Sequence, residues 1–255
     1  MRNGLENDVA HIQAAGIQLA EGSQRLLDQS AVIVSRTQLK GADGLLQAGL
    51  GLIVVIGAAT ITGGAGSNVL HADGGRQKIN LGADDDTLDG GGGNDTVASR
   101  AGDDLLIGGA GHDHVHGGQH HDTLRGKTGQ DVLSGGRGHD RLSGGRGADH
   151  LSGQRGHDHL RGKHGNDTLD GGAGNDTLIG GAGADRFTIS RGKDVIADFN
   201  ISEGDAIVIP DDLDLNLTIS QSGDHLLLID ESQDVRTKLL NVDRDDFIAA
   251  FPELL

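Results

Sequence analysis

Residues 90–98 read GGGGNDTVA, and this nine-residue pattern decides the fold. A register that starts at Gly63 and advances by nine gives fourteen units ending at Thr188, with no insertion or deletion. The eighth position of every unit is apolar, and the sixth is aspartate in the last twelve units. Repetition at a fixed short period is the signature of a solenoid, in which each unit packs against its neighbours.

Each unit combines a turn with a short strand. Glycines occupy most first, second and fourth positions. We expect all three to supply the positive φ angles of a tight turn and to let main-chain carbonyls crowd together. The three residues after the aspartate, as in Arg141-Leu142-Ser143, alternate polar and apolar side chains. That alternation is typical of a very short strand with one side chain directed inwards, so the stacked units predict an all-β solenoid.

The sixth-position carboxylates are the candidate metal ligands. Ca²⁺ takes about six to eight oxygen ligands in flexible geometry, and an aspartate that closes a glycine turn offers a carboxylate beside main-chain carbonyls. The twelve aspartates are Asp86, Asp95, Asp104, Asp113, Asp122, Asp131, Asp140, Asp149, Asp158, Asp167, Asp176 and Asp185. They predict a series of calcium sites along the repeat.

The unit resembles the RTX (haemolysin-type) nonapeptide, G-G-x-G-x-D-x-U-x, over about half of the chain. The resemblance implies a right-handed parallel β-roll, in which two units form one coil and Ca²⁺ lies between successive coils on each side. Aspartates two units apart would then share an ion, as Asp86 with Asp104 and Asp167 with Asp185. The twelve aspartates form ten such pairs, which implies roughly ten ions.

The resemblance implies further ligands. Glycine carbonyls of the same turns would complete the shells, namely those of Gly91, Gly93, Gly109, Gly111, Gly136, Gly138, Gly145, Gly147, Gly172, Gly174, Gly181 and Gly183. The segment after the repeats looks like the one that follows the roll in secreted RTX proteases and lipases. That likeness implies that Asp194, Asp198 and Asp205 bind further Ca²⁺.

Some units depart from the pattern. The first two carry Asn68 and Gln77 at the sixth position, so residues 63–89 are expected to form a capping start with weak or absent sites. His120 replaces a fourth-position glycine, which predicts one weakened site. Other glycine positions are taken by Leu81, Asp84, Ser99 and Arg100.

The composition limits what the chain can do. A formal charge of −17 disfavours nucleic acid as a partner, and the absence of Cys excludes disulfides and thiolate metal sites. Burial of one apolar side chain per unit contributes less free energy than the conformational entropy that is lost when a chain with 45 glycines is ordered. We therefore expect metal binding to supply the remaining folding energy, so that the repeats are disordered without Ca²⁺.

Histidines form a second pattern within the repeats. His121, His139 and His157 occupy the fifth position of units two apart, which predicts a ladder along one edge of the solenoid. One interpretation is that this position tolerates any polar residue. The other is an edge that binds a second metal such as Zn²⁺ or Ni²⁺, or that responds to pH.

The flanks divide the chain into residues 1–62, 63–188 and 189–255. Residues 5–29 have the apolar spacing of an amphipathic helix, and residues 31–39 are expected to form a strand. The apolar stretch 45–61 predicts either buried strands that cap the first coil or membrane insertion. Beyond the repeats, we expect a hairpin from 217–220 and 226–230, a third strand at 235–242 and a closing helix at 243–255.

These features favour a non-enzymatic calcium-binding protein. No H-E-x-x-H motif, no G-x-S-x-G motif and no Cys nucleophile is present. No N-terminal signal peptide is expected, and the resemblance implies an uncleaved C-terminal type I secretion signal, export by that machinery and folding outside the cell. The alternatives are a membrane-active effector that uses residues 44–62, the calcium-binding tail of an RTX hydrolase, and an adhesive surface. The sequence leaves open whether the protein has a membrane or cell-surface partner.

Overall fold

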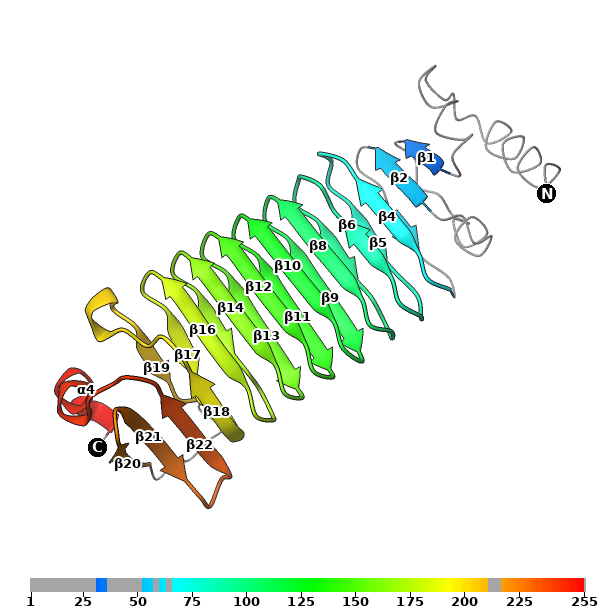
Figure 1. The fold of residues 1–255 in the computed structure, drawn as a ribbon. Helices are drawn as coiled ribbons and strands as arrows, with labels where there is room; N and C mark the ends of the chain where they lie inside the picture. The colour runs from blue at the N-terminus through cyan, green and yellow to red at the C-terminus, as the bar shows by residue number, and fades with distance from the viewer. Residues whose placement is uncertain (1–30, 36–51, 57–59, 63–65, 211–216, 255) are drawn as a thin grey trace.

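The protein is a flattened parallel β-solenoid in the computed structural model, which describes residues 31–35, 52–56, 60–62, 66–210 and 217–254 (Figure 1). Its two faces are a 13-stranded and a 9-stranded sheet, between which the chain alternates as it advances along one axis. The predicted all-β solenoid is therefore confirmed. The repeats fold this way because each unit contributes one short strand and one turn.

The elements have the following bounds. The larger sheet contains, in spatial order, β1 (Ala31–Ser35), β2 (Leu52–Ile56), β4 (Val69–Ala72), β6 (Thr87–Asp89), β8 (Leu105–Ala110), β10 (Thr123–Thr128), β12 (Arg141–Arg146), β14 (His159–His164), β16 (Thr177–Ala182), β18 (Gly192–Ile196), β22 (Val235–Leu239), β21 (His225–Asp230) and β20 (Thr218–Ser222). The smaller sheet contains β19 (Ala206–Val208), β17 (Arg186–Thr188), β15 (Thr168–Asp170), β13 (His150–Arg155), β11 (Val132–Arg137), β9 (His114–Gln119), β7 (Thr96–Ala98), β5 (Lys78–Asn80) and β3 (Thr60–Thr62). The helical elements described are η1 (Ile201–Glu203), α4 (Arg244–Ala250) and η2 (Pro252–Leu254).

Two nonapeptides make one coil. Leu124 pairs with Leu142 in the larger sheet, and Leu133 pairs with Leu151 in the smaller one. Both partners are 18 residues apart, and this spacing holds from the pairing of Thr60 with Lys78 to that of Thr177 with Val195. A constant spacing stacks equivalent positions of every second unit in straight columns.

The eighth-position side chains fill the space between the sheets. Within each strand, burial alternates because successive side chains point to opposite faces, as in β12. The resulting core is one residue wide and at most 2% exposed at Leu70, Ile79, Leu88, Val97, Leu106, Val115, Leu124, Leu133, Leu142, Leu151, Leu160, Leu169, Leu178 and Phe187.

The sheets continue on both sides of residues 63–188. β2 and β3 pair with β4 and β5 at the start, and β18 and β19 pair with β16 and β17 at the end. The unit 189–197 keeps Gly192, Asp194 and Ile196 at the fourth, sixth and eighth positions but lacks both leading glycines. The inward Ile61 and Ile196 are 3% and 0% exposed, so the core needs only the apolar position and not the whole motif.

The described part of the stretch 45–61 forms β2 and β3, which agrees with the expectation of strands that cap the first coil. Among the residues the structure describes, no helix is long and apolar enough to cross a membrane. β1 is the strand expected at 31–39, although it is shorter. The helix expected at 5–29 lies outside the described residues.

The C-terminal region closes the solenoid as a small β-rich cap. β20 and β21 form the expected hairpin, and β22 joins it to β18 of the roll. Asp243 caps the short helix α4 by accepting from the main-chain N–H groups of Asp245 and Asp246. Phe247 of this helix is fully buried against Phe199, which contacts Phe187 at the end of the core.

Candidate metal centre

The sixth-position aspartates form two buried columns, one beside each row of turns. All twelve are at most 2% exposed. In each column, one carboxylate oxygen (Oδ1) accepts the main-chain N–H of the aspartate one coil earlier, as Asp122 accepts from Asp104 at 2.9 Å and Asp140 from Asp122 at 2.8 Å. This bond fixes each carboxylate in the same orientation, so the columns repeat with the coil.

The second oxygen of each carboxylate is unsatisfied. In all twelve aspartates, Oδ2 is buried and has no hydrogen-bond partner. A buried acceptor without a partner is costly, and twelve of them in register are not explained by folding alone. They fit a hard cation, because Ca²⁺ is bound by carboxylate and carbonyl oxygens.

Burial makes these carboxylates reluctant to ionise in the protein alone. It raises the pKa of Asp122, Asp131, Asp158 and Asp167 from the ordinary 3.8 to about 7. The neighbouring aspartates of the same column add a smaller upward contribution to each pKa by repulsion between like charges. A divalent cation in the column would reverse both effects.

First-position glycines make room for the carboxylates. A Cβ on Gly117 would overlap Oδ2 of Asp122 and press on the carbonyl oxygen of Gly135 in the next coil, and the same arrangement recurs at Gly126 and Gly162. None of the first-position glycines that the structure describes has a positive φ, so the expectation of a special turn conformation there is wrong. Glycine is needed at this position because no side chain fits beside the carboxylate.

This crowding also identifies oxygens that the sequence reasoning missed. The first-position carbonyls of Gly135, Gly144, Gly171 and Gly180 each point to the glycine that faces an Oδ2 atom. The signal available in the sequence was the glycine at nearly every first position. In the sequence these glycines look like turn residues, although the positive φ angles of the turn lie at second and fourth positions.

Most second- and fourth-position glycines that the structure describes do have left-handed conformations. φ is 118° at Gly109 and 134° at Gly111, for example. At both, a Cβ would overlap the carbonyl oxygen of the equivalent residue one coil earlier, Gly91 or Gly93. The same stacking occurs at the other predicted carbonyl ligands, which are Gly136, Gly138, Gly145, Gly147, Gly172, Gly174, Gly181 and Gly183. The carbonyls predicted as ligands therefore lie in columns along the turns.

The ends of the aspartate columns differ from their middle. Asp194 and Asp205 extend the columns by accepting from the N–H groups of Asp176 and Asp185. Their second oxygens are satisfied, by the hydroxyl of Ser190 and the N–H of Asn200. The structure thus brings both residues to the columns, where they close them with hydrogen bonds.

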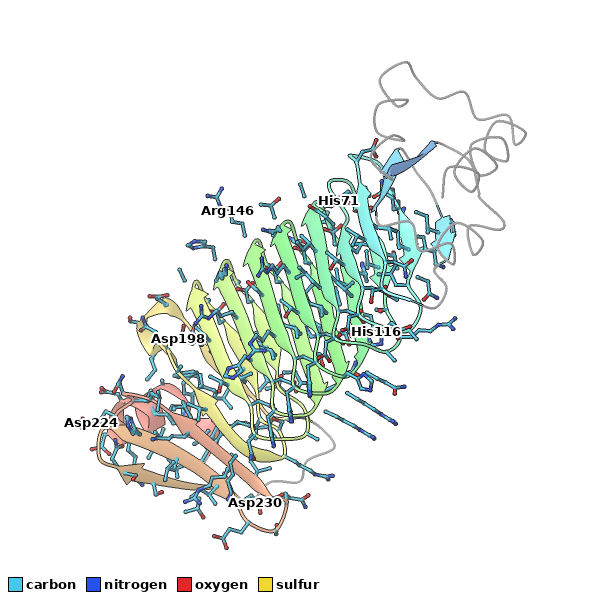
Figure 2. All side chains as sticks on the ribbon, turned by 45° about the vertical axis from the view of Figure 1, so that its right-hand side comes forward. His71, His116, Arg146, Asp198, Asp224 and Asp230 are labelled. Atoms are coloured by element: carbon cyan, nitrogen blue, oxygen red, sulfur yellow. The ribbon has the colours of Figure 1, made fainter. Side chains whose placement is uncertain are left out.

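Asp198 lies near the C-terminal end of the solenoid, opposite the end that carries His71 (Figure 2). Its two carboxylate oxygens accept from the N–H groups of Gly180 and Gly181. At the first coil, Asn68 donates from its amide to Oδ1 of Asp86. This amide takes the place of a carboxylate, as expected for a capping unit.

His120 keeps the backbone of the glycine it replaces. Its φ is 80°, and its carbonyl oxygen stacks on Gly138 in the way that the carbonyl of Gly111 stacks on Gly129. The substitution therefore strains the turn without moving the carbonyl. The weakened site at this turn stays a prediction.

The histidine ladder exists and has a structural function. The rings of His121 and His139 stack with centroids 5.1 Å apart, and those of His139 and His157 at 4.9 Å. Nδ1 of each accepts the main-chain N–H of the next coil, at 2.8 Å in each case. Asp103 and Asn166 make the equivalent bond at their fifth positions, so this position selects an acceptor. The hypothesis of a second metal stays a prediction, to be tested by calorimetric titration of Zn²⁺ in saturating Ca²⁺.

The oxygen donors fit Ca²⁺, provided that main-chain groups take part. Among the described residues, no three His, Asp or Glu side chains converge on one point. A site in either column would therefore combine one or two aspartates with glycine carbonyls of the adjacent turns. Such a mixture of carboxylate and carbonyl oxygens is typical of Ca²⁺ sites.

Comparison with known proteins agrees with this geometry. The family model described as RTX calcium-binding nonapeptide repeat matches eight overlapping stretches: 56–88, 73–106, 99–133, 116–151, 125–160, 134–169, 152–187 and 161–196. A search of curated protein sequences gave no match. The matched stretches together cover residues 56–196, which is more than half of the chain. The chain therefore belongs to the RTX family of calcium-binding nonapeptide-repeat proteins.

Proposed function

We propose that this protein is a secreted, non-enzymatic calcium-binding protein whose roll folds when about ten Ca²⁺ ions enter the two aspartate columns. The single observation that carries the proposal is the set of twelve buried Oδ2 atoms without partners. A cation between successive coils would satisfy two carboxylates and remove the repulsion between them. At the C-terminal ends of the columns, both carboxylate oxygens of Asp194 and Asp205 already accept hydrogen bonds. The ions therefore belong between the interior aspartates.

Ion counting tests the stoichiometry. Equilibrium dialysis of the full chain against Ca²⁺ is expected to give about ten bound ions. Asp122→Asn removes one unsatisfied oxygen from the middle of a column and is expected to remove one or two ions. The control is Asp103→Asn, which removes the same charge from an exposed fifth position and keeps the acceptor for the N–H of His121. Equal losses in both variants would argue against the columns as the sites.

Export is proposed to use the type I secretion machinery, with the signal in residues 190–255. Low calcium inside the cell would keep the repeats unfolded for passage, and higher calcium outside would fold them. Secretion of the full chain is expected to depend on residues 190–255 when it is compared with a chain that lacks them. Equal secretion of both chains would contradict this route.

The absence of an enzymatic activity is part of the proposal. The sixth-position aspartates and the fifth-position histidines form columns and ladders that join successive coils. The sequence contains no H-E-x-x-H motif, no G-x-S-x-G motif and no Cys nucleophile. A membrane-active effector is less well supported, because the described part of residues 44–62 is already used in β2 and β3. Leakage of liposomes by the full chain, lost on deletion of 44–62, would favour that alternative.

A further inference from the structure

One face of the solenoid is strongly basic, although the whole chain carries a formal charge of −17. The strands β10, β12 and β14 expose six arginines and lysines, and the strands β8 to β16 of this sheet contain no Asp or Glu. The six are Arg125, Lys127, Arg141, Arg146, Arg161 and Lys163. The matching strands of the opposite sheet, β9, β11 and β13, carry only Arg137 and Arg155.

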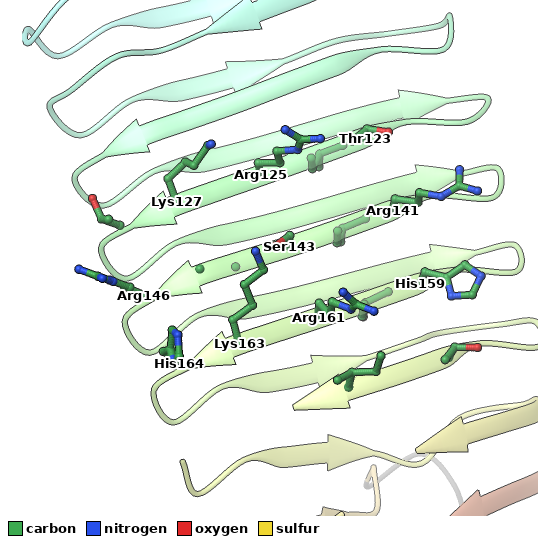
Figure 3. A pocket seen from close by; sticks show the side chains of 18 residues that line it. Thr123, Arg125, Lys127, Arg141, Ser143, Arg146, His159, Arg161, Lys163 and His164 are labelled. Atoms are coloured by element: carbon green, nitrogen blue, oxygen red, sulfur yellow. The ribbon is translucent and has the colours of Figure 1, made fainter. Parts of the chain in front are cut away.

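The six cations, here called the basic face, line a groove of about 730 Å³ across β10, β12, β14 and part of β16 (Figure 3). The register places Ser143 between Arg125 and Arg161, and Gly145 between Lys127 and Lys163. Neighbouring strands lie about 4.8 Å apart, so the backbones that carry the two cations of each pair are separated by roughly 10 Å. The small residue lies between them on β12. Lys163 extends towards Ser143 in Figure 3. The groove thus has a small, hydroxyl-bearing floor with cations on both sides.

The positive charge of the groove is not neutralised within the protein. In the described part of the chain, ion pairs are formed by His71 with Asp89 and by Arg244 with Asp245, and neither pair involves the basic face. Six cations gathered on an otherwise acidic molecule create a local field that attracts anionic groups. The face is therefore available to a ligand.

Two of the cations occupy positions that suit glycine. Lys127 and Lys163 stand at the second position of their units, with φ angles of 86° and 87°. Their counterparts in the adjacent coils of the same sheet are Gly109, Gly145 and Gly181. A side chain in the left-handed region strains the backbone, and such strain is characteristic of functional positions. Both strained lysines face the same groove.

We infer that the basic face binds a linear acidic polysaccharide. Its carboxylate or sulfate groups would pair with the arginines and lysines, and its hydroxyls would meet Ser143 and the threonines of the groove. An extended polymer also matches a groove that crosses several identical coils.

The chemistry of the face argues against other polyanions. Proteins that bind single-stranded nucleic acid stack its bases on aromatic side chains, whereas this chain has no Trp or Tyr and four Phe, all of which pack together at the C-terminal end. Membrane surfaces are bound with the help of apolar side chains. The one exposed large hydrophobic residue among those described is Val132, on the opposite sheet.

The test uses the full chain in saturating Ca²⁺ and the anisotropy of fluorescein-labelled dextran sulfate, with neutral dextran as competitor. The double variant Lys127→Gly/Lys163→Gly is expected to bind about tenfold more weakly or worse. It is expected to keep the circular dichroism and thermal stability of the wild type, because glycine suits the left-handed φ at both positions. The control Arg137→Gln/Arg155→Gln removes two charges from the opposite sheet and is expected to change affinity by less than about twofold.

Several results would overturn the inference. These are the absence of binding to dextran sulfate, equal weakening by both double variants, and competition by neutral dextran. Tighter binding to polyglutamate, to a single-stranded oligonucleotide or to anionic vesicles, with the same dependence on the lysines, would assign the groove to that class instead. A dimer that the lysine variant converts to a monomer in light scattering would assign it to a second copy of the chain.

Discussion

At the scale of the residue, each repeat aspartate divides its two oxygens between two tasks. Oδ1 joins the coils through a main-chain N–H, and Oδ2 faces the glycine turn with no partner in the protein. The first task needs only an acceptor, so asparagine performs it equally well. The second task, which is to bind a cation through Oδ2, needs a negative charge and a free lone pair at that atom. Asparagine provides neither when its amide NH2 takes this place. Substitution by asparagine therefore separates structure from metal binding.

Asp122→Asn is predicted to have opposite effects with and without calcium. In saturating Ca²⁺ it lowers the free energy of unfolding by on the order of 2–3 kcal/mol, because bound ions lose a ligand. In calcium-free buffer it stabilises whatever roll forms, because a buried carboxylate with a raised pKa becomes a neutral amide. Urea denaturation followed by circular dichroism measures both values. The same sign under both conditions would rule out a ligand role for this oxygen.

The fifth-position ladder makes a prediction of its own. His139 accepts the N–H of His157 through Nδ1. His139→Asn retains a short side-chain acceptor, as found at Asn166 and Asn175, and is expected to change stability by less than about 0.5 kcal/mol. His139→Ala leaves that N–H to water and is expected to cost about 1 kcal/mol. Chemical denaturation in saturating Ca²⁺ distinguishes the two, and equal stability of both variants would contradict the acceptor role.

At the scale of the element, a coil is two turns and two strands, and the turns set the limits of substitution. Gly147 has φ of 130°, and its missing Cβ leaves room for the carbonyl of Gly129. Gly92, at a third position, has no positive φ, and a Cβ there would meet its nearest neighbours at 3.6 Å. Glycines that look alike in the sequence therefore have different reasons to be present.

Gly147→Ala is expected to destabilise the calcium-loaded roll by about 2–4 kcal/mol, since it strains the turn and displaces a carbonyl. Gly92→Ala is expected to be within about 0.5 kcal/mol of the wild type, as alanine already occupies the third position at Ala110 and Ala173. Thermal melting in saturating Ca²⁺ provides the comparison. Comparable losses in the two variants would show that the turn geometry is not the determining factor.

The sequence predicts the coil well because the apolar eighth position and the sixth-position aspartate both recur every nine residues. The 18-residue pairing and the narrow core follow from this recurrence. Unit 189–197 was missed because Ile189 and Ser190 replace its leading glycines. The reason for the first-position glycines was also missed, because a steric requirement and a conformational one leave the same letter in a sequence.

At the scale of the whole molecule, the buried aspartates together make the stability of the fold depend on pH. Without metal, burial holds the pKa of several aspartates near 7 in the folded roll, against an ordinary 3.8. The folded state then binds more protons than the unfolded state between these values. This source of stability is fully present below pH 3.8 and is lost as the pH rises through 7.

Calcium-stripped protein is therefore expected to show more β-structure near pH 4 to 5 than at pH 8, with the loss centred between about 4 and 7. Saturating Ca²⁺ should abolish this loss, because the ion replaces the protons on the carboxylates. Circular dichroism across this range is the measurement. A metal-free β-signal that stays constant or increases with pH would contradict the burial of these groups.

The basic face could not be foreseen from the repeat pattern, because its cations come in pairs from β10, β12 and β14 and meet only when the three coils stack. The same stacking creates the aspartate columns, so the molecule as a whole depends on one event. We propose that this event is calcium binding, because the core is one residue wide and the carboxylates beside the turns lack partners within the protein.

A far-UV circular dichroism titration of the calcium-stripped full chain at neutral pH tests this account most directly. Addition of Ca²⁺ to millimolar concentration is predicted to convert a largely disordered spectrum into that of a β-protein in one cooperative step, and excess EDTA to reverse it. A β-spectrum that neither EDTA nor millimolar Ca²⁺ changes would contradict the claim that calcium drives folding.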